Sequence, residues 1–459
     1  MSISTDDVSQ HGPSVVLVHG IFGWGERRPF FGLAPPYFPI EELQAEWGYG
    51  LLVTVDVGVT TSDHDRACET FAQLLGMRTD YGEQHANDCG HHQHGPDFRS
   101  VGPLLPCWNA AHPVHLVGHS FGGNTVVELL GLLARDFWNL GTSIDWVLSV
   151  TCICSPLCGC TLPFRLGLQP ASHIDGQDVP ASWSLAHVLY TSFATFWKLG
   201  LRWPWLRNLY DTRTDQWCSH SSWKGLLTLD HPFWNSADNV MHTVTPRFRQ
   251  KQLQSLTPYL QKVHFIMVVA DSLTPLTSQR LAAGVAVLLF PTIVCLLSLV
   301  RRLKSCRGRL GAMLGRLAQI FLLYISSSIS ILLLFSRDRK KWHVLLEHVR
   351  PYLHASLVRP FLRIVGHLVQ HTASNMPTGH GLPSVNGVYA NDGFIDLVAQ
   401  RVPDGLLPCA GVCSSQSFVA RSHIGTKLVV KDLTTPSRCW HVVHVPGADH
   451  SLGTWLCNE

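Results

Sequence analysis

The sequence has few charged residues, and the charges it has are nearly balanced in sign. Only 15% of its 459 residues are Asp, Glu, Lys or Arg, and the formal net charge is +3. Without an excess of positive charge the chain lacks the electrostatic signature of a nucleic-acid-binding protein, so no nucleic-acid partner is expected. Its mean hydropathy is instead +0.12, which is high for a soluble protein.

Two further features are absent. The first residues, "MSISTDDVSQHGPS", contain neither the basic segment nor the apolar segment of a secretory signal peptide, and residues 1–13 are expected to be disordered. The 14 cysteines lack the C-x-x-C spacing of common zinc sites, even in the dense stretch "VTCICSPLCGC". Because a chain of this length needs no disulfide framework, reduced thiols and an intracellular location are predicted.

Short apolar runs rich in β-branched residues alternate with stretches long enough for helices. This pattern predicts an α/β fold, in which a mostly parallel sheet is covered by helices on both faces. Helices are expected at Asp65–Gly76 and from Phe121 to about Arg135, and residues 14–459 are expected to form a single domain. The apolar runs are "VVLVHG", "LLVTVDVG", "VHLVGHS", "WVLSVTCI", "VHFIMVVAD" and "HVVHVP".

The stretch "VGHSFGG" places Ser120 between Gly118 and Gly122, in the pattern G-x-S-x-G. Glycine is needed on both sides of such a serine because the strained turn brings backbone segments too close together for a Cβ atom. The pattern alone is weak evidence. Here it lies between an apolar strand and a predicted helix, and this setting favours a nucleophile over an ordinary turn.

A nucleophilic serine requires a histidine base oriented by a carboxylate, and on this fold they follow the serine in the order acid, then histidine. Asp392 in "YANDGFIDLVAQ" and His450 in "HVVHVPGADHSLG" fit that order, while Asp396 and Asp449 are alternative acids. Taken alone, Asp392 would more often be a turn residue bonded to its own backbone.

The oxyanion of the tetrahedral intermediate needs two N–H donors. The backbone of Phe121, directly after the nucleophile, is one candidate. The other is Ile21 in "VLVHGIFGWG", a loop after an early strand. His19 and Gly20 in the same loop equally fit a role in shaping the turn.

Several segments together resemble the zinc-containing thermoalkalophilic bacterial lipases and their plant lipase-like relatives. The resemblance spans most of residues 14–270 and resumes around 387–452. It implies an α/β-hydrolase with a lid, the triad Ser120, Asp392 and His450, and oxyanion donors Ile21 and Phe121. The segments are "VLVHGIFGWG", "DRACETFAQLLG", "DYGEQH", "VGHSFGG", "VLSVT", "YDTRTDQW", "NDG" and "DH".

The same resemblance implies a structural zinc ion. Two carboxylates and two imidazoles can close a neutral tetrahedral shell around Zn²⁺. For the fourth ligand His92 and His94 are alternatives to His91, and Asp65 could instead cap a helix. The implied ligands are Asp65, His85, His91 and Asp238.

Calcium is not predicted. The bacterial members bind calcium with a glutamate two residues past the catalytic histidine, and this chain has Leu452 at that position.

Two regions concentrate the apolar residues. Tryptophan and leucine crowd between Ser182 and Trp223, inside a predicted lid region of about 165–260, either as core aromatics or as a cap that exposes apolar surface to lipid. Leu281–Val300 and Leu317–Phe335 contain no charged residue and form part of a predicted helical insertion of about 276–375. Helices of that length could cross a membrane, dip into one leaflet or a lipid-droplet surface, or form a soluble lid.

The sequence therefore predicts a serine carboxylester hydrolase acting on lipid esters, with triacylglycerol as the expected substrate and a membrane or lipid-droplet surface as its partner. A phospholipase, galactolipase or acyltransferase would use the same residues. A membrane-associated, non-catalytic hydrolase relative is the alternative of a different class, favoured by the short segment that follows His450.

Overall fold

The computed structural model describes most of the N-terminal 271 residues and a few short pieces beyond them. Asp392, Asp396, Asp449 and both uncharged apolar runs lie outside the described part, as do residues 1–11 of the predicted disordered segment. The described residues are 12–47, 50–169, 179–181, 184–217, 232–260, 262–271, 347, 350, 362, 418–419, 440–446, 450–452 and 454.

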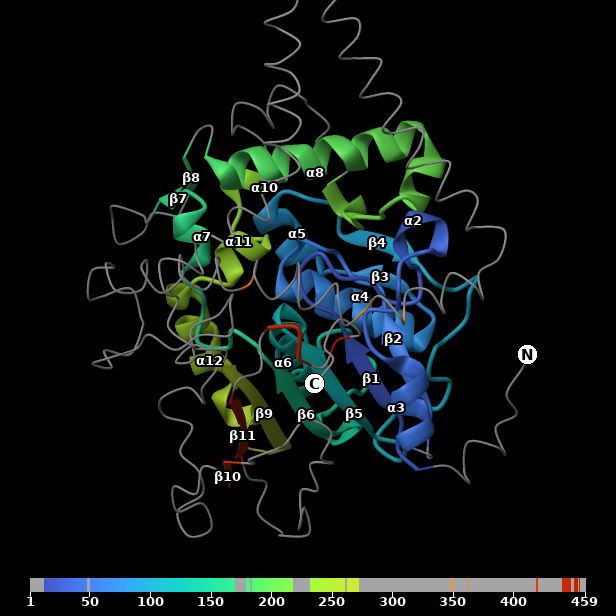
Figure 1. Cartoon of the computed structure of the whole chain (residues 1–459). Helices are drawn as coiled ribbons and strands as arrows, with labels where there is room; N and C mark the ends of the chain where they lie inside the picture. Colours follow the sequence, from blue (N-terminus) through green and yellow to red (C-terminus); the bar gives the residue numbers. More distant parts are fainter. Residues whose placement is uncertain are drawn as a thin grey trace, which may run out of the picture.

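A seven-stranded sheet forms the lower half of the molecule in Figure 1, and every pair of neighbouring strands in it is parallel. Six of its strands are the six apolar runs of the sequence; the seventh, β10, was not predicted. In spatial order the strands are β10 (Phe418–Val419), β11 (Trp440–Pro446), β9 (His264–Asp271), β6 (Val147–Ile153), β5 (Val114–His119), β1 (Val15–Val18) and β2 (Leu52–Val55).

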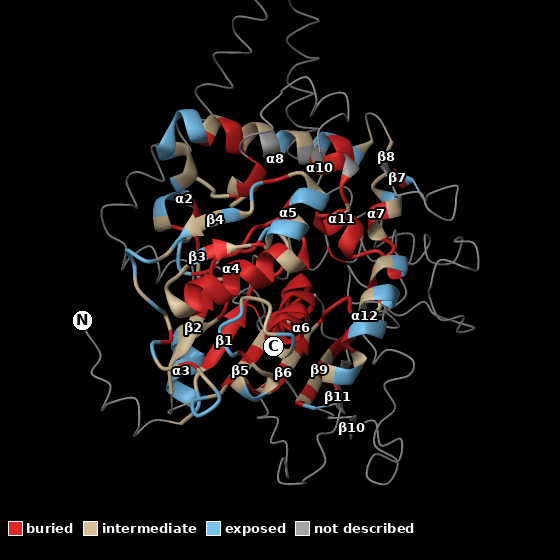
Figure 2. Cartoon of the chain, turned by 180° about the vertical axis from the view of Figure 1, so that it is seen from behind, coloured by how far each residue is buried: buried red, intermediate tan, exposed pale blue. Residues whose placement is uncertain are grey.

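Strand β1, within the sheet, is buried on both faces, which explains why it is continuously apolar. In β1, Val16 and Val18 belong to the main core with α4 (Asp63–Leu75) and α6 (Phe121–Ala134), whereas Val15 and Leu17 belong to a separate cluster beside α3 (Ile40–Trp47). Figure 2 shows α4 and α6 as almost entirely buried helices. A parallel sheet covered on both faces is the predicted α/β architecture.

Both predicted helices are present: α6 begins at Phe121 as predicted, and only the start of α4 is shifted. Helix α4 begins two residues before Asp65, because the hydroxyl of Ser62 accepts the backbone N–H of Asp65 at 3.1 Å and caps the helix. Gly76 ends it in the left-handed conformation, with φ of 64°. Asp65 is therefore not the helix cap, and its carboxylate is available for another role.

The predicted lid region contains helices, and its tryptophans are partly buried and partly exposed. Helix α8 (Leu185–Arg202) crosses the top of the molecule in Figure 1 and is followed by η2 (Pro204–Asn208). Trp217 and Trp234 are buried in a second core with Phe121, whereas Trp203 and Trp205 are exposed. The tryptophan-rich segment thus supplies core aromatics and exposed apolar surface at once.

Shorter elements complete the upper layer and the edges of the fold. Within the ranges given above, no helix combines the length and the apolar character that a membrane crossing requires. The shorter elements are α2 (Pro29–Gly32), β3 (Arg78–Asp80), α5 (Glu83–Cys89), β4 (His94–Asp97), η1 (Ile144–Trp146), α7 (Leu162–Arg165), β7 (Leu168–Gln169), β8 (Val179–Pro180), η3 (Asp215–Trp217), α10 (Pro232–Asn235), α11 (Val240–Thr243) and α12 (Pro246–Leu260).

Candidate active site and metal centre

Ser120 occupies the sharp turn between β5 and α6. Its φ of 55° and ψ of −128° lie in a region that residues with a side chain rarely adopt. The backbone N–H of Ser120 donates to the carbonyl of Ile153 at 2.8 Å, which fixes the turn against β6. A strained serine held at the carboxyl edge of a parallel sheet has the geometry of a nucleophile elbow.

The glycines on either side of Ser120 are required by close backbone approach. A Cβ atom on Gly118 would lie 2.3 Å from the carbonyl carbon of Gly122, and one on Gly122 would lie 2.1 Å from the carbonyl oxygen of Val18. Both distances are far below van der Waals contact. The motif therefore has the steric basis that the sequence pattern suggested.

The structure brings His450 to Ser120 from the far end of the chain. His450 follows β11, and its Nε2 lies 2.9 Å from the Oγ of Ser120. Ser120 is 7% exposed. A serine hydroxyl within hydrogen-bond distance of an imidazole is the arrangement needed for nucleophilic catalysis. Asp392, the predicted acid, lies outside the described residues.

The predicted oxyanion donors lie at two backbone positions beside the nucleophile. Phe121 is the first residue of α6, where backbone N–H groups have no partner inside the helix. Ile21 follows Gly20, and a Cβ atom on Gly20 would lie 2.8 Å from the Cβ of Ser120, so this turn rests directly on the nucleophile. Among the described residues, no backbone hydrogen bond uses the N–H of Ile21 or Phe121.

A hydrogen-bonded chain that sequence reasoning did not predict connects the oxyanion turn to His450. The N–H of Gly20 donates to the hydroxyl of Tyr37 at 3.1 Å, and that hydroxyl lies 2.7 Å from Nδ1 of His119. Nε2 of His119 lies 2.8 Å from the carbonyl oxygen of His450. Because a carbonyl can only accept, Nε2 of His119 carries the proton and Nδ1 accepts from Tyr37.

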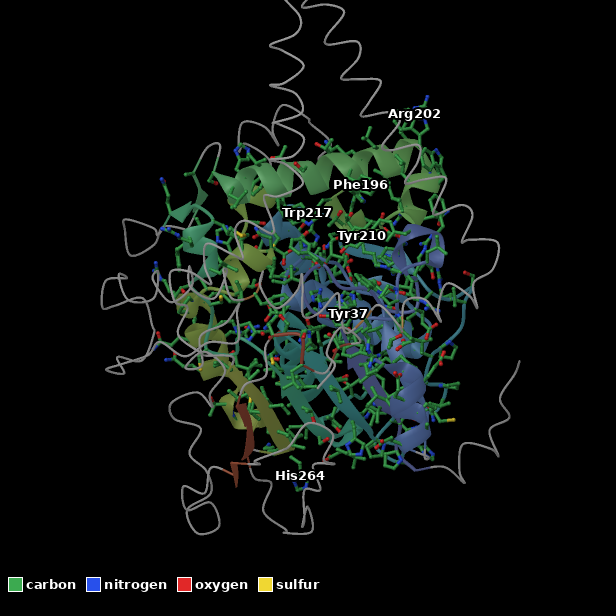
Figure 3. All side chains as sticks on the ribbon, viewed as in Figure 1. Tyr37, Phe196, Arg202, Tyr210, Trp217 and His264 are labelled. Carbon is green, nitrogen blue, oxygen red and sulfur yellow. The ribbon has the colours of Figure 1, made fainter. Side chains whose placement is uncertain are left out.

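This series of hydrogen bonds requires a neutral His119, because Nδ1 accepts a hydrogen bond and only Nε2 carries a proton. Burial, together with the neighbouring His450, lowers the pKa of His119 to about 3. Figure 3 shows Tyr37 near the centre of the molecule, between the sheet and α8. No sequence signal marked Tyr37, and His119 stood only at a variable position of the G-x-S-x-G motif.

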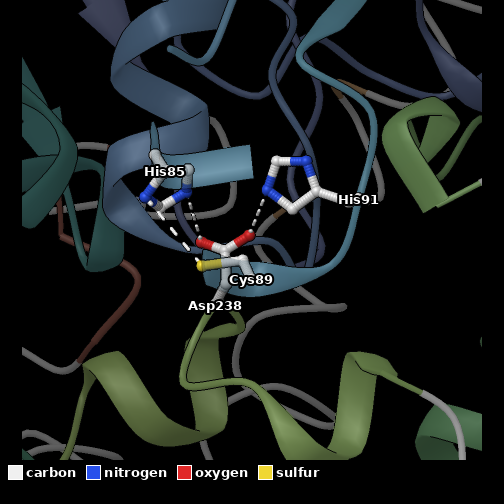
Figure 4. Close-up of side chains that lie close together, drawn as sticks. All are labelled: His85, Cys89, His91 and Asp238. Atoms are coloured by element: carbon white, nitrogen blue, oxygen red, sulfur yellow. Dashed lines mark hydrogen bonds and ion pairs between the residues drawn. The ribbon is translucent and has the colours of Figure 1, made fainter. Parts of the chain in front are cut away.

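The four predicted metal ligands converge from four segments of the chain. Nε2 of His85 lies 3.3 Å from one carboxylate oxygen of Asp65 and 3.3 Å from one of Asp238. Nε2 of His91 lies 3.0 Å from the other oxygen of Asp238 and 3.8 Å from Asp65. Figure 4 shows both imidazoles directed at the carboxylate of Asp238. The two aspartates are completely buried.

The hydrogen bonds around this cluster leave its inner atoms without partners. Both carboxylate oxygens of Asp238, Oδ1 of Asp65 and the Nε2 atoms of His85 and His91 are buried and unsatisfied within the described residues. The outer atoms are occupied: Nδ1 of His91 donates to the carbonyl of His92 at 2.8 Å, and Nε2 of Gln216 donates to Asp65 at 2.6 Å. In a metal site, the ligand atoms that face the ion lack hydrogen-bond partners in the protein, while hydrogen bonds to the other atoms of the same side chains hold them in orientation. This cluster shows both features.

The electrostatics also favour a cation at this position. Burial lowers the pKa of His91, but the close approach of the Asp238 carboxylate outweighs burial and raises the pKa to about 10. The carboxylates of Asp238 and Asp65 likewise raise the pKa of His85 against the effect of burial. Without a metal ion, the two buried carboxylates draw protons onto both imidazoles. A divalent cation would supply the same positive charge between them.

The positions of the neighbouring histidines favour His91 over His92 and His94 as the fourth ligand. His92 and His94 are exposed, whereas the side chain of His91 is fully buried in the cluster. Cys89 also lies there, with its Sγ 3.9 Å from Nδ1 of His85, and it belongs to a group of side chains able to hold a metal ion. The sequence analysis missed Cys89 because a lone cysteine has no spacing signature. Leu452, at the position of the absent calcium ligand, packs near Cys154 and Ala270.

The fold is also found in solved structures of bacterial lipases. The structure resembles Staphylococcus hyicus lipase (TM-score 0.52, 17% identity, 98% of this chain and 90% of that one) and lipase 1 from Pelosinus fermentans (TM-score 0.52, 20% identity, 96% and 93%). At these identities the likeness shows the fold alone, and it confirms the predicted α/β-hydrolase fold.

Sequence comparison then connects the N-terminal part of the chain to bacterial lipases. Residues 12–139 match the family model described as "Lipase-like, C-terminal domain". Lipase 2 of Staphylococcus aureus is 38% identical over 119 residues, which is 24% of this chain and 16% of that lipase. The lipase of S. hyicus is 41% identical over 70 residues, 15% and 10% of the two chains. The matched part spans less than a fifth of these relatives, and over it the predicted resemblance to bacterial lipases is confirmed.

Proposed function

We propose that the protein is a serine carboxylester hydrolase that acts on lipid esters, with triacylglycerol as its substrate. The observation that carries this proposal is the 2.9 Å approach of His450 Nε2 to Ser120 Oγ at a strained, glycine-flanked turn. The bacterial lipases related to residues 12–139 support the same reaction class.

In the proposed reaction, Nε2 of His450 takes the proton from Ser120 as Oγ attacks the ester carbonyl carbon. The imidazolium then protonates the departing alcohol oxygen, and an acyl-enzyme remains on Ser120. His450 next takes a proton from a water molecule, whose oxygen attacks the acyl carbon and releases the fatty acid. Asp392 is proposed as the carboxylate that orients His450, and the N–H groups of Ile21 and Phe121 as donors to the oxyanion.

We also propose that the protein works at the surface of a membrane or a lipid droplet. Four large aromatic side chains support this: Phe30 and Phe31 in α2 are 47% and 50% exposed, and Trp203 and Trp205 are 48% and 57% exposed. The two segments adjoin, since η2 packs on both α2 and α8 and the N–H of Phe30 donates to Leu209 at 2.9 Å. Aromatic rings of this kind partition favourably into the lipid interface.

The backbone of α2 adds to this argument. Phe30 and Phe31 have φ of 54° and 59°, a left-handed conformation that is unfavourable for bulky residues. Such strain persists where the surrounding structure imposes it, often at functional positions. Figure 3 shows Arg202 directed away from the molecule at the end of α8. An intracellular location is proposed as well, and the free thiols of Cys68, Cys89, Cys107 and Cys152 support a reducing compartment.

For the metal centre we propose zinc, held by Asp65, His85, His91 and Asp238. The donor set fits this ion, because Zn²⁺ favours four-coordinate shells of nitrogen and oxygen ligands. Four protein ligands leave no open position for a reactive water, so the ion would be structural. Asp65 lies in α4 and Asp238 lies two residues before α11, so the ion would cross-link two segments that are far apart in the sequence.

A lipid panel with purified full-length protein tests the proposed activity. Triacylglycerol, phospholipid and galactolipid are supplied as emulsions or vesicles, and released fatty acid is measured for the wild type and for Ser120→Ala. We expect release from triacylglycerol that Ser120→Ala abolishes. Release from phospholipid or galactolipid alone, or transfer of the acyl group to another alcohol, would replace triacylglycerol hydrolysis by the corresponding alternative. A folded wild type that releases nothing from any lipid would favour a non-catalytic role.

A further inference from the structure

Arg66 is among the largest completely buried side chains of the protein, and the proposed reaction gives it no role. It lies in α4 beside the metal-site residue Asp65, but its side chain reaches toward the nucleophile elbow. Within the described part of the chain, no carboxylate lies within ion-pair distance of its guanidinium. An arginine guanidinium keeps its proton in a protein interior, so Arg66 is a cation. A buried cation that makes no direct ion pair is costly and calls for an explanation.

The contacts of Arg66 lie on both sides of the candidate oxyanion hole. One terminal nitrogen donates to the carbonyl of His19, two residues before Ile21. Nε donates at 2.9 Å to the hydroxyl of Thr125, which in turn donates at 3.1 Å to the carbonyl of Phe121. The guanidinium carbon also lies 5.5 Å from the centre of the Phe121 ring. One side chain therefore contacts the turn that carries one donor and the helix turn that carries the other.

Arg66 makes a third contact, with the loop that follows β2. The other terminal nitrogen of Arg66 donates to the carbonyl of Gly58. The neighbouring Val59 accepts the N–H of Phe22 at 3.3 Å, directly after Ile21. The turn at Ile21 is thus held at His19 by Arg66 and at Phe22 by the loop that Arg66 also contacts. The hydrogen-bond partners of the guanidinium are therefore neutral oxygens, while Glu69 and Asp63 of the same helix act on its charge from a greater distance.

We propose that Arg66 is the positioning residue of the oxyanion hole. It fixes the spacing between the N–H groups of Ile21 and Phe121, and its positive charge favours the negative charge that develops there. This inference rests on the proposed hydrolase function. Lysine at this position keeps the charge but cannot make three directed hydrogen bonds from a planar fork. A displacement of about 1 Å at a catalytic group can cost about 100-fold in rate.

The test measures kcat and KM for nitrophenyl butyrate and the affinity for an alkylboronic acid, which forms a tetrahedral adduct on a reactive serine. For Arg66→Lys we expect kcat to fall about 100-fold, KM to change by less than about threefold, and boronate affinity to fall in parallel with kcat. A merely structural role would lower thermal stability but leave the kcat and boronate affinity of the folded fraction unchanged.

Thr125→Val tests the same contact without removing the buried charge, in case Arg66→Lys does not fold. Its matched control is Thr70→Val. Thr70 is also a buried threonine of a helix, with its hydroxyl 2.8 Å from the carbonyl four residues earlier, but that carbonyl belongs to Arg66 and not to the oxyanion hole. We expect Thr125→Val to lower kcat and boronate affinity together by about tenfold and Thr70→Val to leave both unchanged.

The outcomes separate this proposal from the proposed function. A folded wild type that neither cleaves nitrophenyl butyrate nor reacts with a fluorophosphonate would overturn the hydrolase function and the role of Arg66 with it. An active wild type in which Thr125→Val behaves like Thr70→Val, and in which any folded Arg66→Lys keeps its kcat and boronate affinity, would overturn the role of Arg66 alone.

Discussion

Nε2 of His119 donates a hydrogen bond of 2.8 Å to the carbonyl oxygen of His450, although 331 residues separate the two in the chain. His119 directly precedes the nucleophile, so this bond ties the loop that carries the candidate base to the strand that carries the serine. It supplements the contact between His450 and Ser120 itself. The backbone of His450 is thereby positioned independently of its imidazole, which stays available for proton transfer.

The neutral state of His119 predicts that acid destabilises the protein. The pKa of His119 is about 3 in the folded protein and 6.5 in the reference state, so below pH 6.5 the unfolded chain binds more protons. This histidine should cost about 2 kcal/mol at pH 5 relative to pH 7, at about 1.4 kcal/mol per pH unit. Glutamine can donate and accept at the same position but does not titrate. We expect urea unfolding of His119→Gln to depend less steeply on pH; equal slopes in both proteins would contradict this.

Substitutions of the proposed triad should have unequal effects. His450→Ala should lower kcat by about 10⁶, as expected for loss of a catalytic base. Asp392→Asn should lower it by about 10⁴, because the histidine keeps part of its basicity. Asp396→Asn and Asp449→Asn are the matched controls. Hydrolysis of nitrophenyl esters by the four variants provides the measurement, and a larger loss in either control than in Asp392→Asn would assign the acid to that residue.

Elemental analysis should find one zinc ion per chain. His91→Ala should remove it and lower the thermal midpoint, because two buried carboxylates would then face each other without full compensation. His94→Ala is the control, since its side chain is exposed and outside the cluster. Purified wild type without zinc would rule out the ion, and zinc retained in His91→Ala would show that this histidine is not a ligand.

The uncharged runs Leu281–Val300 and Leu317–Phe335 are proposed to insert into lipid. Basic residues flank both runs, so two spans or a shallow hairpin would each return the chain to its starting side and keep Ser120 together with His450. Carbonate extraction of membranes from expressing cells should leave the full chain in the pellet and release a variant that lacks residues 281–335. Equal release of the two proteins would identify the segment as a soluble lid.

Most of the sheet could be predicted from the sequence because its strands are buried on both faces. Burial on two faces makes β1, β5, β6 and β9 almost continuously apolar, and glycine or polar residues mark their ends. β10 escaped prediction since a strand of two residues has no periodicity to read. The start of α4 was placed late because Ser62, its actual cap, precedes two acidic residues that fit the first turn equally well.

The candidate site was predictable only where its signal is local. Ser120 lies in a motif whose glycines are dictated by contacts within a few residues. The metal cluster joins side chains far apart in the sequence, and their spacing carries no signature, so only family resemblance indicated them. Tyr37, His119 and Arg66 acquire their roles through contacts that exist only in the folded chain. No composition or periodicity argument identifies a buried arginine that touches two distant turns.

Labelling by a fluorophosphonate probe, followed by peptide mapping, tests most directly whether Ser120 is an activated nucleophile. Such probes phosphonylate a serine only when a base removes its proton. The account predicts a single adduct on Ser120 in the native wild type, none in Ser120→Ala, and greatly slowed labelling in His450→Ala. An adduct on another serine, labelling that persists in Ser120→Ala, or a folded wild type that does not react would contradict it.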